Sequence, residues 1–276
     1  MMVIAIGALG GSGTRAIAQV LIEAGIYMGD DLNGPNDNLI FTRLFKNPSW
    51  YANASKEEIN KRLDAFRDYM EQDRLSFNSA AVLIKASMTN PTFRQNKKLA
   101  KNILRKIFSA SKERSIWGWK EPNTQIFIDE ISDYFPNLKY IHIVRHGLDM
   151  AFSKNTQQLR NWGHRYDIHL SGKETDDEIA YKQMEYWVRS TQDAVTKGKK
   201  LGERFLLINH STFCQQPIEE IDKLIQFLGA EVKKNKLNEL YQVPKKPTTL
   251  GRYKNHDLQM FDERHISYVK KMGFEL

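Results

Sequence analysis

The chain has 276 residues, of which 41% are hydrophobic and 27% are charged, and it contains no low-complexity tract and no repeat at a fixed period. This composition is typical of a globular protein and excludes a disordered or repetitive one. The formal net charge of +8 favours anionic partners, and the single cysteine, Cys214, excludes an intramolecular disulfide and a thiolate zinc site.

The first residues do not have the features of a signal peptide. Met2–Ile6 is apolar but short, no basic segment precedes it, and a glycine-rich stretch interrupts it at once. No apolar run approaches the roughly 18 residues that a membrane-spanning helix needs. We therefore expect a cytoplasmic chain without an integral membrane segment.

The chain begins with a pattern of strand, glycine loop and helix. The apolar run Met2–Ile6 suits a buried parallel strand. After the glycines, Ala16, Val20 and Leu21 recur at helical spacing, and Gly25 is placed to end the helix. This order predicts the opening of an α/β domain.

The next stretch, from about 40 to 112, lacks the alternation of strand and helix. Helices are predicted over 39–46, 56–72 and 92–109, and Ser55 with Glu58 forms a capping box for the second. The apolar run 80–87 fits either a helix or a strand. We interpret the stretch as a helical insertion or lid, within a single domain that spans residues 1–276.

A basic run lies at the end of this stretch. Eight lysines and arginines stand between Arg94 and Arg114 against one acid, Glu113. The pattern predicts a solvated helix face. No nucleic-acid-binding motif accompanies the run, so we do not expect nucleic acid as a partner.

The alternation of strands and helices returns after residue 115. Strands are predicted over 115–120, 138–144 and 205–208, and helices over 124–134, from 147 to about 159, 176–200 and 218–228. With the first strand, this pattern predicts an α/β fold with a parallel central sheet and helices on both faces. Ligands of such sheets bind at the carboxyl ends of the strands.

The first glycine loop, Gly7–Arg15, is suited to bind an anion. Glycines let the backbone approach a ligand closely, and the following helix directs free N–H groups at the same point. A nucleotide-hydrolysing P-loop carries lysine before its final Ser or Thr, where this chain has Gly13 before Thr14. Gly11–Ala16 also fits the dinucleotide pattern G-x-G-x-x-G/A formally, without a convincing second strand to support it.

A second anion site is predicted at the end of the strand 138–144. Arg145 stands where a bidentate cation can bind an anion, and Ser153 is placed about two turns into the next helix. An ion pair between Arg145 and Asp149 is the alternative. Two anion sites on one sheet suit a nucleotide that carries phosphate on both its 3′ and 5′ sides.

These two segments together resemble the PAPS-dependent sulfotransferases (PAPS is 3′-phosphoadenosine-5′-phosphosulfate), whose fold is like that of P-loop NTPases. The first segment, Gly-Ser-Gly-Thr-Arg at 11–15, is similar to their 5′-phosphosulfate loop. The second segment is Trp117–Ser153. Its matching residues are Lys120, Pro122, Phe135, Pro136, Val144, Arg145, His146, Asp149 and Ser153.

The resemblance implies roles for individual residues. PAPS is the implied co-substrate, and no metal is required. The residues that would bind PAPS are Gly11, Ser12, Gly13, Thr14 and Arg15 at the 5′-phosphosulfate and Arg145, Ser153, Gly251 and Arg252 at the 3′-phosphate. Lys120 would be the catalytic cation. Asp31 would be the catalytic base, with Asp30, Asp37 and Glu121 as rivals.

The acceptor is not identified by the sequence, although the basic run favours an anionic glycan or a lipid. Three other functions are compatible with parts of the pattern: a P-loop nucleotide or small-molecule kinase, a non-catalytic nucleotide-binding protein, and a dinucleotide-dependent oxidoreductase. A P-loop kinase would need a lysine at the position where this chain has Gly13. The oxidoreductase makes no use of Arg145 or Ser153. The oligomeric state is not predicted.

Overall fold

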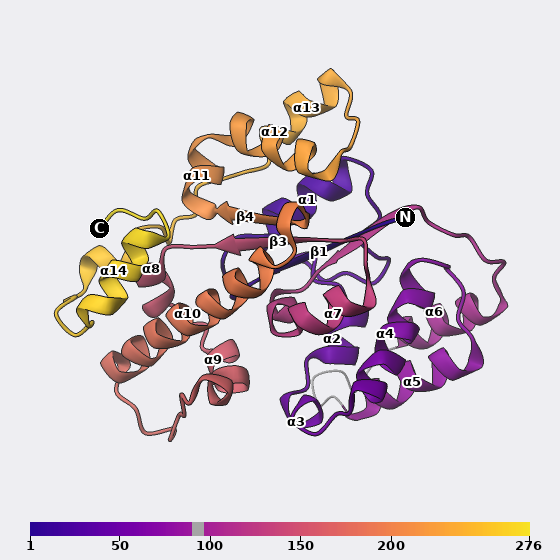
Figure 1. The fold of residues 1–276 in the computed structure, drawn as a ribbon, viewed down its shortest axis with the longest axis horizontal. Coiled ribbons are helices and arrows are strands. Elements are labelled where there is room, and N and C mark those ends of the chain that lie inside the picture. The colour runs from indigo at the N-terminus through magenta and orange to yellow at the C-terminus, as the bar shows by residue number, and fades with distance from the viewer. Residues whose placement is uncertain (90–96) are drawn as a thin grey trace.

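The computed structural model describes residues 1–89 and 97–276, and its centre is a sheet of four parallel strands (Figure 1). The strand order is β2-β1-β3-β4. The strands are β1 (Met2–Ala8), β2 (Ile116–Lys120), β3 (Leu138–Val144) and β4 (Phe205–Asn209). Because all pairs are parallel, the loops that follow the strands lie at one edge. The predicted α/β fold is confirmed.

Alternate residues of the strands point into two separate cores. In β1, Val3 and Ala5 belong to one hydrophobic cluster, while Ile4 and Ile6 belong to the other. Helices cover both faces, so the central strands β1 and β3 are buried on both sides (Figure 1), whereas alternate residues of the edge strand β4 are only partly buried. The face of Ile4 and Ile6 is covered by α1 (Thr14–Glu23), α11 (His210–Gln215), α12 (Pro217–Leu228) and α13 (Lys234–Leu240).

The opposite core is larger, because the helices between residues 39 and 108 pack into it. Its first helices are α2 (Leu39–Phe45), α3 (Pro48–Tyr51), α4 (Lys56–Met70), α5 (Phe77–Thr89) and α6 (Lys97–Phe108). The later ones are α7 (Ile128–Tyr134), α8 (Gly147–Ala151), α9 (Gln157–Trp162), α10 (Asp176–Lys199) and α14 (Glu263–Lys271). The 3-10 helices are η2 (Pro122–Phe127), η3 (Gly163–Tyr166), η4 (Gly202–Arg204) and η5 (Arg252–Asn255).

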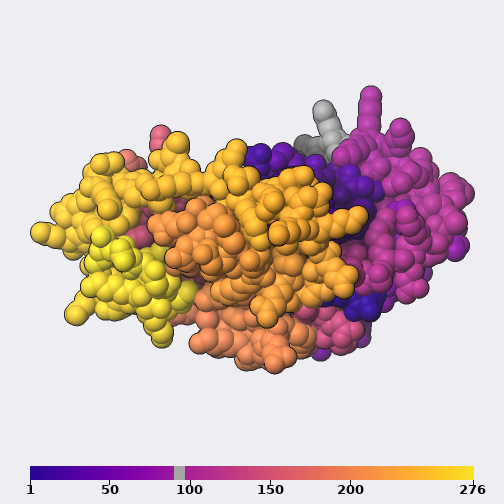
Figure 2. All heavy atoms as spheres, turned by 90° about the horizontal axis from the view of Figure 1, so that it is seen from above, coloured from indigo at the N-terminus to yellow at the C-terminus, as the bar shows by residue number. Residues whose placement is uncertain are grey.

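Between α1 and β2 the described residues form helices α2 to α6 and, apart from isolated bridges at Tyr27, Leu32 and Asn38, no strand. Helices α2 to α6 and the C-terminal segment lie at opposite ends of the molecule (Figure 2). The capping box of Ser55 and Glu58 is present at the start of α4. The ambiguous run 80–87 is helical, because Ala80, Leu83 and Ala86 bury one face of α5. Residues 92–96 of the predicted basic helix lie outside the described residues, and α6 begins at Lys97.

The prediction that the basic run forms a solvent-exposed helix face is wrong at Lys106, whose side chain is 0% exposed. Its ammonium group pairs with Asp73 and lies 3.4 Å from Asp30. Arg105 pairs with Asp30 at 2.7 Å. Part of the positive charge is therefore neutralised inside the fold.

The prediction of one continuous helix from 147 to about 159 is also wrong. In the structure α8 ends at Ala151, and the next helix, α9, begins only at Gln157. The carbonyls of Ala151 and Ser153 accept hydrogen bonds from the side chain of Gln183 on α10 at 2.7 and 2.9 Å. This long-range contact satisfies backbone groups that helix continuation would otherwise use.

No helix within residues 1–89 and 97–276 is both long and apolar enough to cross a membrane.

Candidate active site

The glycine loop joins the end of β1 to α1 in the middle of the sheet. Gly11 and Gly13 have φ angles of +91° and +90°, a region that side chains other than glycine rarely adopt. A β-carbon at Gly13 would lie 2.0 Å from Cδ2 of His210. No side chain caps α1, so its first N–H groups are left for a ligand.

A cavity of about 330 Å³ adjoins this loop. Gly11, Gly13, Thr14 and Arg15 line it on one side. Lys120, at the carboxyl end of β2, lines it on another. Ser12 is buried within the loop, and its backbone N–H donates to the carbonyl of Leu9 at 3.1 Å. The cavity therefore lies between the glycine loop and the buried side chain of Lys120.

Lys120 is held by the segment that precedes α2. Its Nζ donates to the carbonyl of Pro35 at 2.8 Å and to Oδ1 of Asp37 at 2.5 Å. The backbone N–H of Asn38 donates to the carbonyl of Lys120 at 2.7 Å, which fixes the segment against the end of β2. Asp37 is thus the acid that accompanies the predicted catalytic cation.

Asp31 occupies a different place. Its carboxylate is 2% exposed, and its two oxygens pair with Arg43 at 2.5 Å and Lys98 at 3.2 Å. The described carboxylates that line the cavity are Asp37 and Glu121, not Asp31. The prediction of Asp31 as catalytic base does not fit this placement, because both of its oxygens are engaged by cations away from the cavity. Asp30 is likewise paired, with Arg105 and Lys106.

Glu121 follows Lys120 and combines burial with access to the cavity. Its Oε2 accepts from the backbone N–H of Asn123 at 2.6 Å, and its Oε1 accepts from the side-chain amide of Asn123 at 2.8 Å. Burial raises the pKa of Glu121 to about 7. A carboxyl group with this pKa exchanges a proton readily near neutral pH.

Arg145 links the glycine loop to the C-terminal segment. Its guanidinium donates to the carbonyl of Gly11 at 3.0 Å and to Oγ1 of Thr249 at 2.8 Å. The alternative ion pair is also present, since Nη2 lies 3.8 Å from Asp149. Buried Nε finds no partner among the described residues, so one donor of Arg145 is left for a ligand.

The other residues predicted at the 3′-phosphate gather near Arg145. The backbone N–H of Gly251 donates to Asp149 at 3.0 Å, and Arg252 donates to the carbonyl of Phe152 at 3.4 Å. Ser153 lies in the irregular segment after α8, not two turns into a helix, and its hydroxyl accepts from the N–H of Asn155 at 3.2 Å. The structure thus brings Gly251 and Arg252 beside the segment that carries Ser153.

A second cavity, of about 460 Å³, lies beside this cluster. Lys246, Gly251 and Lys254 line one part of it, and Ser211, next to His210, lines another. His210 is buried beneath Gly13, and burial together with the charge of Arg145 lowers its pKa to about 4. The imidazole is therefore neutral at physiological pH and adds no charge to the site.

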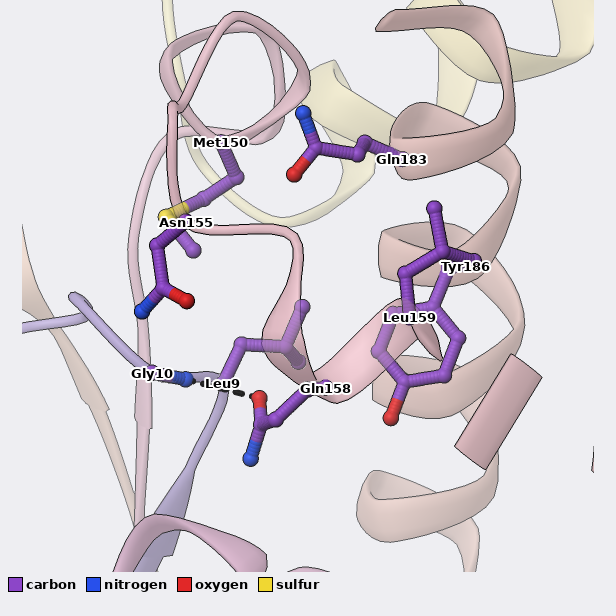
Figure 3. A pocket seen from close by; sticks show the side chains of 8 residues that line it. All are labelled: Leu9, Gly10, Met150, Asn155, Gln158, Leu159, Gln183 and Tyr186. Atoms are coloured by element: carbon purple, nitrogen blue, oxygen red, sulfur yellow. Dashed lines mark hydrogen bonds between the residues drawn. The ribbon is translucent and has the colours of Figure 1, made fainter. Parts of the chain in front are cut away.

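Two supporting residues have no sequence signal. Gln158 accepts a hydrogen bond from the N–H of Gly10 at 2.7 Å (Figure 3). It also donates to the carbonyl of Ala8 at 3.3 Å, and the two bonds brace the glycine loop. The cavity beside it, of about 20 Å³, has room for about one water molecule. His210 is the second such residue. Both lie more than 140 residues from the loop, beyond the reach of any local pattern.

Comparisons with known proteins agree with this geometry. A sequence model described as the sulfotransferase family matches residues 4–234, and the chain therefore belongs to that family. It is an enzyme that transfers a sulfuryl group. No curated protein sequence matches the chain significantly.

Solved structures show the same fold at low sequence identity. One is the sulfotransferase domain of the olefin synthase from Synechococcus PCC 7002, with 14% identity, a TM-score of 0.52, and coverage of 100% of this chain and 95% of that one. Another is the sulfotransferase domain of the curacin biosynthetic pathway, with 13% identity, a TM-score of 0.50, and coverage of 100% and 98%.

Proposed function

We propose that the enzyme uses PAPS as donor and transfers its sulfuryl group to a hydroxyl or amine of the acceptor. The observation that carries the proposal is the meeting of three features at the ends of adjacent strands. These are the glycine loop after β1, Lys120 at the end of β2 and Arg145 after β3. A nucleotide with phosphate on both its 3′ and 5′ sides needs such a pair of separate anion sites.

The residues present fit this donor. The uncapped start of α1 and the glycine backbone at Gly11 and Gly13 suit the 5′-phosphosulfate, with Thr14 and Arg15 beside it. Ser12 is buried in the loop and would support it from behind. The unpartnered Nε of Arg145 suits an anion at the other site, where Ser153, Gly251 and Arg252 gather. When bound, PAPS supplies the activated sulfuryl group.

The chain's own residues would bind and position the reactants. Lys120, buried at the edge of the cavity, would offset the negative charge that develops on the leaving oxygen. Asp37 would hold the Lys120 ammonium in place. Glu121 would accept the acceptor's proton, in place of the predicted Asp31, because it lines the cavity and its pKa lies near 7.

This assignment predicts a specific pH dependence. Burial raises the pKa of Glu121 to about 7, so the carboxyl is protonated and inactive as a base below that value. We expect kcat to rise about tenfold per pH unit below 7 and to level off above it. Glu121→Gln should lower kcat by about 10²–10⁴-fold and abolish the rise. An unchanged profile in Glu121→Gln, with loss of the rise in Asp37→Asn, would assign the base to Asp37 instead.

Calorimetry with 3′,5′-bisphosphoadenosine tests the donor directly. We expect micromolar binding to the wild type, no binding of ATP or NAD, and at least about tenfold weaker binding in Arg145→Ala, since a charge-assisted hydrogen bond contributes roughly 1.5–3 kcal/mol. Arg204→Ala is the matched control, because Arg204 binds the carbonyl of Pro136 near the opposite ends of the strands. A preference for ATP would support a kinase, and a preference for NAD an oxidoreductase; either would reject the proposal.

Other expectations remain predictions: the glycan or lipid acceptor, independence from metal, the cytoplasmic location and the single domain. Within the described residues, no group of three or more His, Cys, Asp or Glu side chains is arranged to hold a metal ion.

A further inference from the structure

Exposed apolar side chains concentrate on the helices α5 and α6. Of the nine large hydrophobic side chains that are exposed among the described residues, five lie on these two helices. They are Phe77, Ile84, Met88, Leu104 and Phe108. Phe77, Met88 and Phe108 are 77%, 78% and 80% exposed, so they contribute little to the core.

Helical spacing places these side chains opposite the buried face of each helix. On α5 the exposed residues 77, 84 and 88 fall on one stripe, while Leu83 and Ala86 face the core on the other side. On α6 the residues 97, 101, 104 and 108 repeat the same spacing, while Leu99 and Ile103 are buried. Phe77 and Ile107 line one shared cavity, so the start of α5 lies beside the end of α6. We call this surface the α5–α6 face.

The α5–α6 face and its surroundings carry positive charge that the fold does not neutralise. Arg105, Lys106 and Arg114 pair with acids, as does Lys98. Five other cations of this region form no ion pair with a described residue; they are Arg74, Lys85, Lys97, Lys101 and Lys112. Between residues 74 and 114 the sequence contains one acid, Glu113, so little negative charge stands against them.

We propose that the α5–α6 face docks the enzyme on an anionic lipid bilayer. Exposed Phe, Leu, Ile and Met side chains beside lysines form the combination by which an amphipathic helix lies in the interface of such a bilayer. The apolar side chains enter the boundary of the acyl chains, and the lysines bind the anionic headgroups. Nucleic acid is favoured less, because two aliphatic residues and a methionine of the face offer no stacking surface for bases. The proposal does not depend on the donor or on catalysis.

The α5–α6 face is also connected to the active site. Lys98 of α6 pairs with Asp31 at 3.2 Å, and Arg105 pairs with Asp30 at 2.7 Å. These acids begin the segment that carries Asp37 to Lys120. A bilayer under α5 and α6 would therefore contact one helix, α6, that is paired with the start of the segment holding Lys120.

Vesicle flotation of the full chain tests the proposal without any need for turnover. We expect binding to vesicles of 30% phosphatidylserine in phosphatidylcholine, weaker binding as salt rises, and little binding to phosphatidylcholine alone. The charge variant Lys97→Glu/Lys101→Glu should weaken binding at least about 25-fold, because each lysine near an anionic surface contributes roughly fivefold. The apolar variant Met88→Ser/Phe108→Ser should weaken it at least about tenfold.

The control is Lys233→Glu/Lys234→Glu, which makes the same charge change at the start of α13, on the other face of the sheet. It should retain at least half of the wild-type affinity. All variants alter exposed side chains, and melting curves establish that each is folded. The proposal is overturned by absence of binding to anionic vesicles, by equal losses in the α13 control, or by wild-type binding in the apolar variant. RNA is the alternative ligand. If RNA binds as strongly as the vesicles do, and if the apolar substitutions do not weaken that binding, the α5–α6 face is a nucleic-acid surface and the membrane proposal is rejected.

Discussion

Replacing Lys120 with alanine should lower kcat for sulfuryl transfer by about 10²–10³-fold while leaving the affinity for 3′,5′-bisphosphoadenosine within about threefold of the wild type. The bisphosphate lacks the transferred group, so it does not need the cation beside the leaving oxygen. Lys120 is 2% exposed, and a buried ammonium group acts on a developing charge with little screening by water. Single-turnover transfer from labelled PAPS and calorimetry measure the two effects separately.

The control for this substitution is Lys46→Ala. Lys46 lines the same cavity but donates to Gln157 at 3.1 Å instead of sitting at the end of β2. A loss below about tenfold in Lys46→Ala would show that the position of Lys120, not positive charge in general, is required. Retention of wild-type kcat in a folded Lys120→Ala enzyme would reject its catalytic role. Loss of bisphosphate binding in that variant would instead make Lys120 a donor-binding residue.

The second large effect is expected at Gly13. Gly13→Ala must hold a φ of +90°, which costs roughly 1–2 kcal/mol, and its β-carbon would lie 2.0 Å from the buried ring of His210. We expect the free energy of unfolding to fall by about 2–4 kcal/mol and the affinity for the bisphosphate to fall by more than about tenfold, because the loop must move away from the ring. Denaturant unfolding and calorimetry measure both quantities.

Two variants separate the collision from the backbone conformation. Gly172 has a φ of +83°, and a β-carbon added there would have no atom within 4 Å, so Gly172→Ala should lose only about 1–2 kcal/mol. The double variant Gly13→Ala/His210→Ala should recover stability relative to the sum of its single changes. Strict additivity in that cycle would mean that His210 does not determine the cost at Gly13.

The sequence patterns that were informative were the local ones. An apolar run followed by glycines predicted β1 and the uncapped start of α1, and the run of β-branched residues before Arg145 predicted β3. These predictions succeeded because buried parallel strands and helix starts depend on the residue types within a few positions. The apolar run 80–87 could not be assigned, since its burial depends on the packing of α5 against α4.

Long-range contacts, which a local sequence pattern does not reveal, determine where α8 ends and which cations pair with Asp31. The side chain of Gln183, more than 30 residues away in the sequence, donates a hydrogen bond to the carbonyl of Ala151, where α8 ends. Arg43 and Lys98 engage Asp31, whereas the segment that follows it places Asp37 against Lys120. All of these acids had been plausible by position alone. Only the folded chain distinguishes them, because ion pairs form between side chains that tertiary packing brings together.

The sequence by itself therefore determined the α/β class, the glycine loop and the residues Lys120 and Arg145 at the ends of their strands. These features follow from short-range apolar patterning and from the parallel order of the strands. The tertiary structure alone decided that His210 lies beneath Gly13, that Gln158 braces the loop and that Glu121 rather than Asp31 lines the cavity. Each of these depends on segments far apart in the chain, whose distances are set by the packing of both cores.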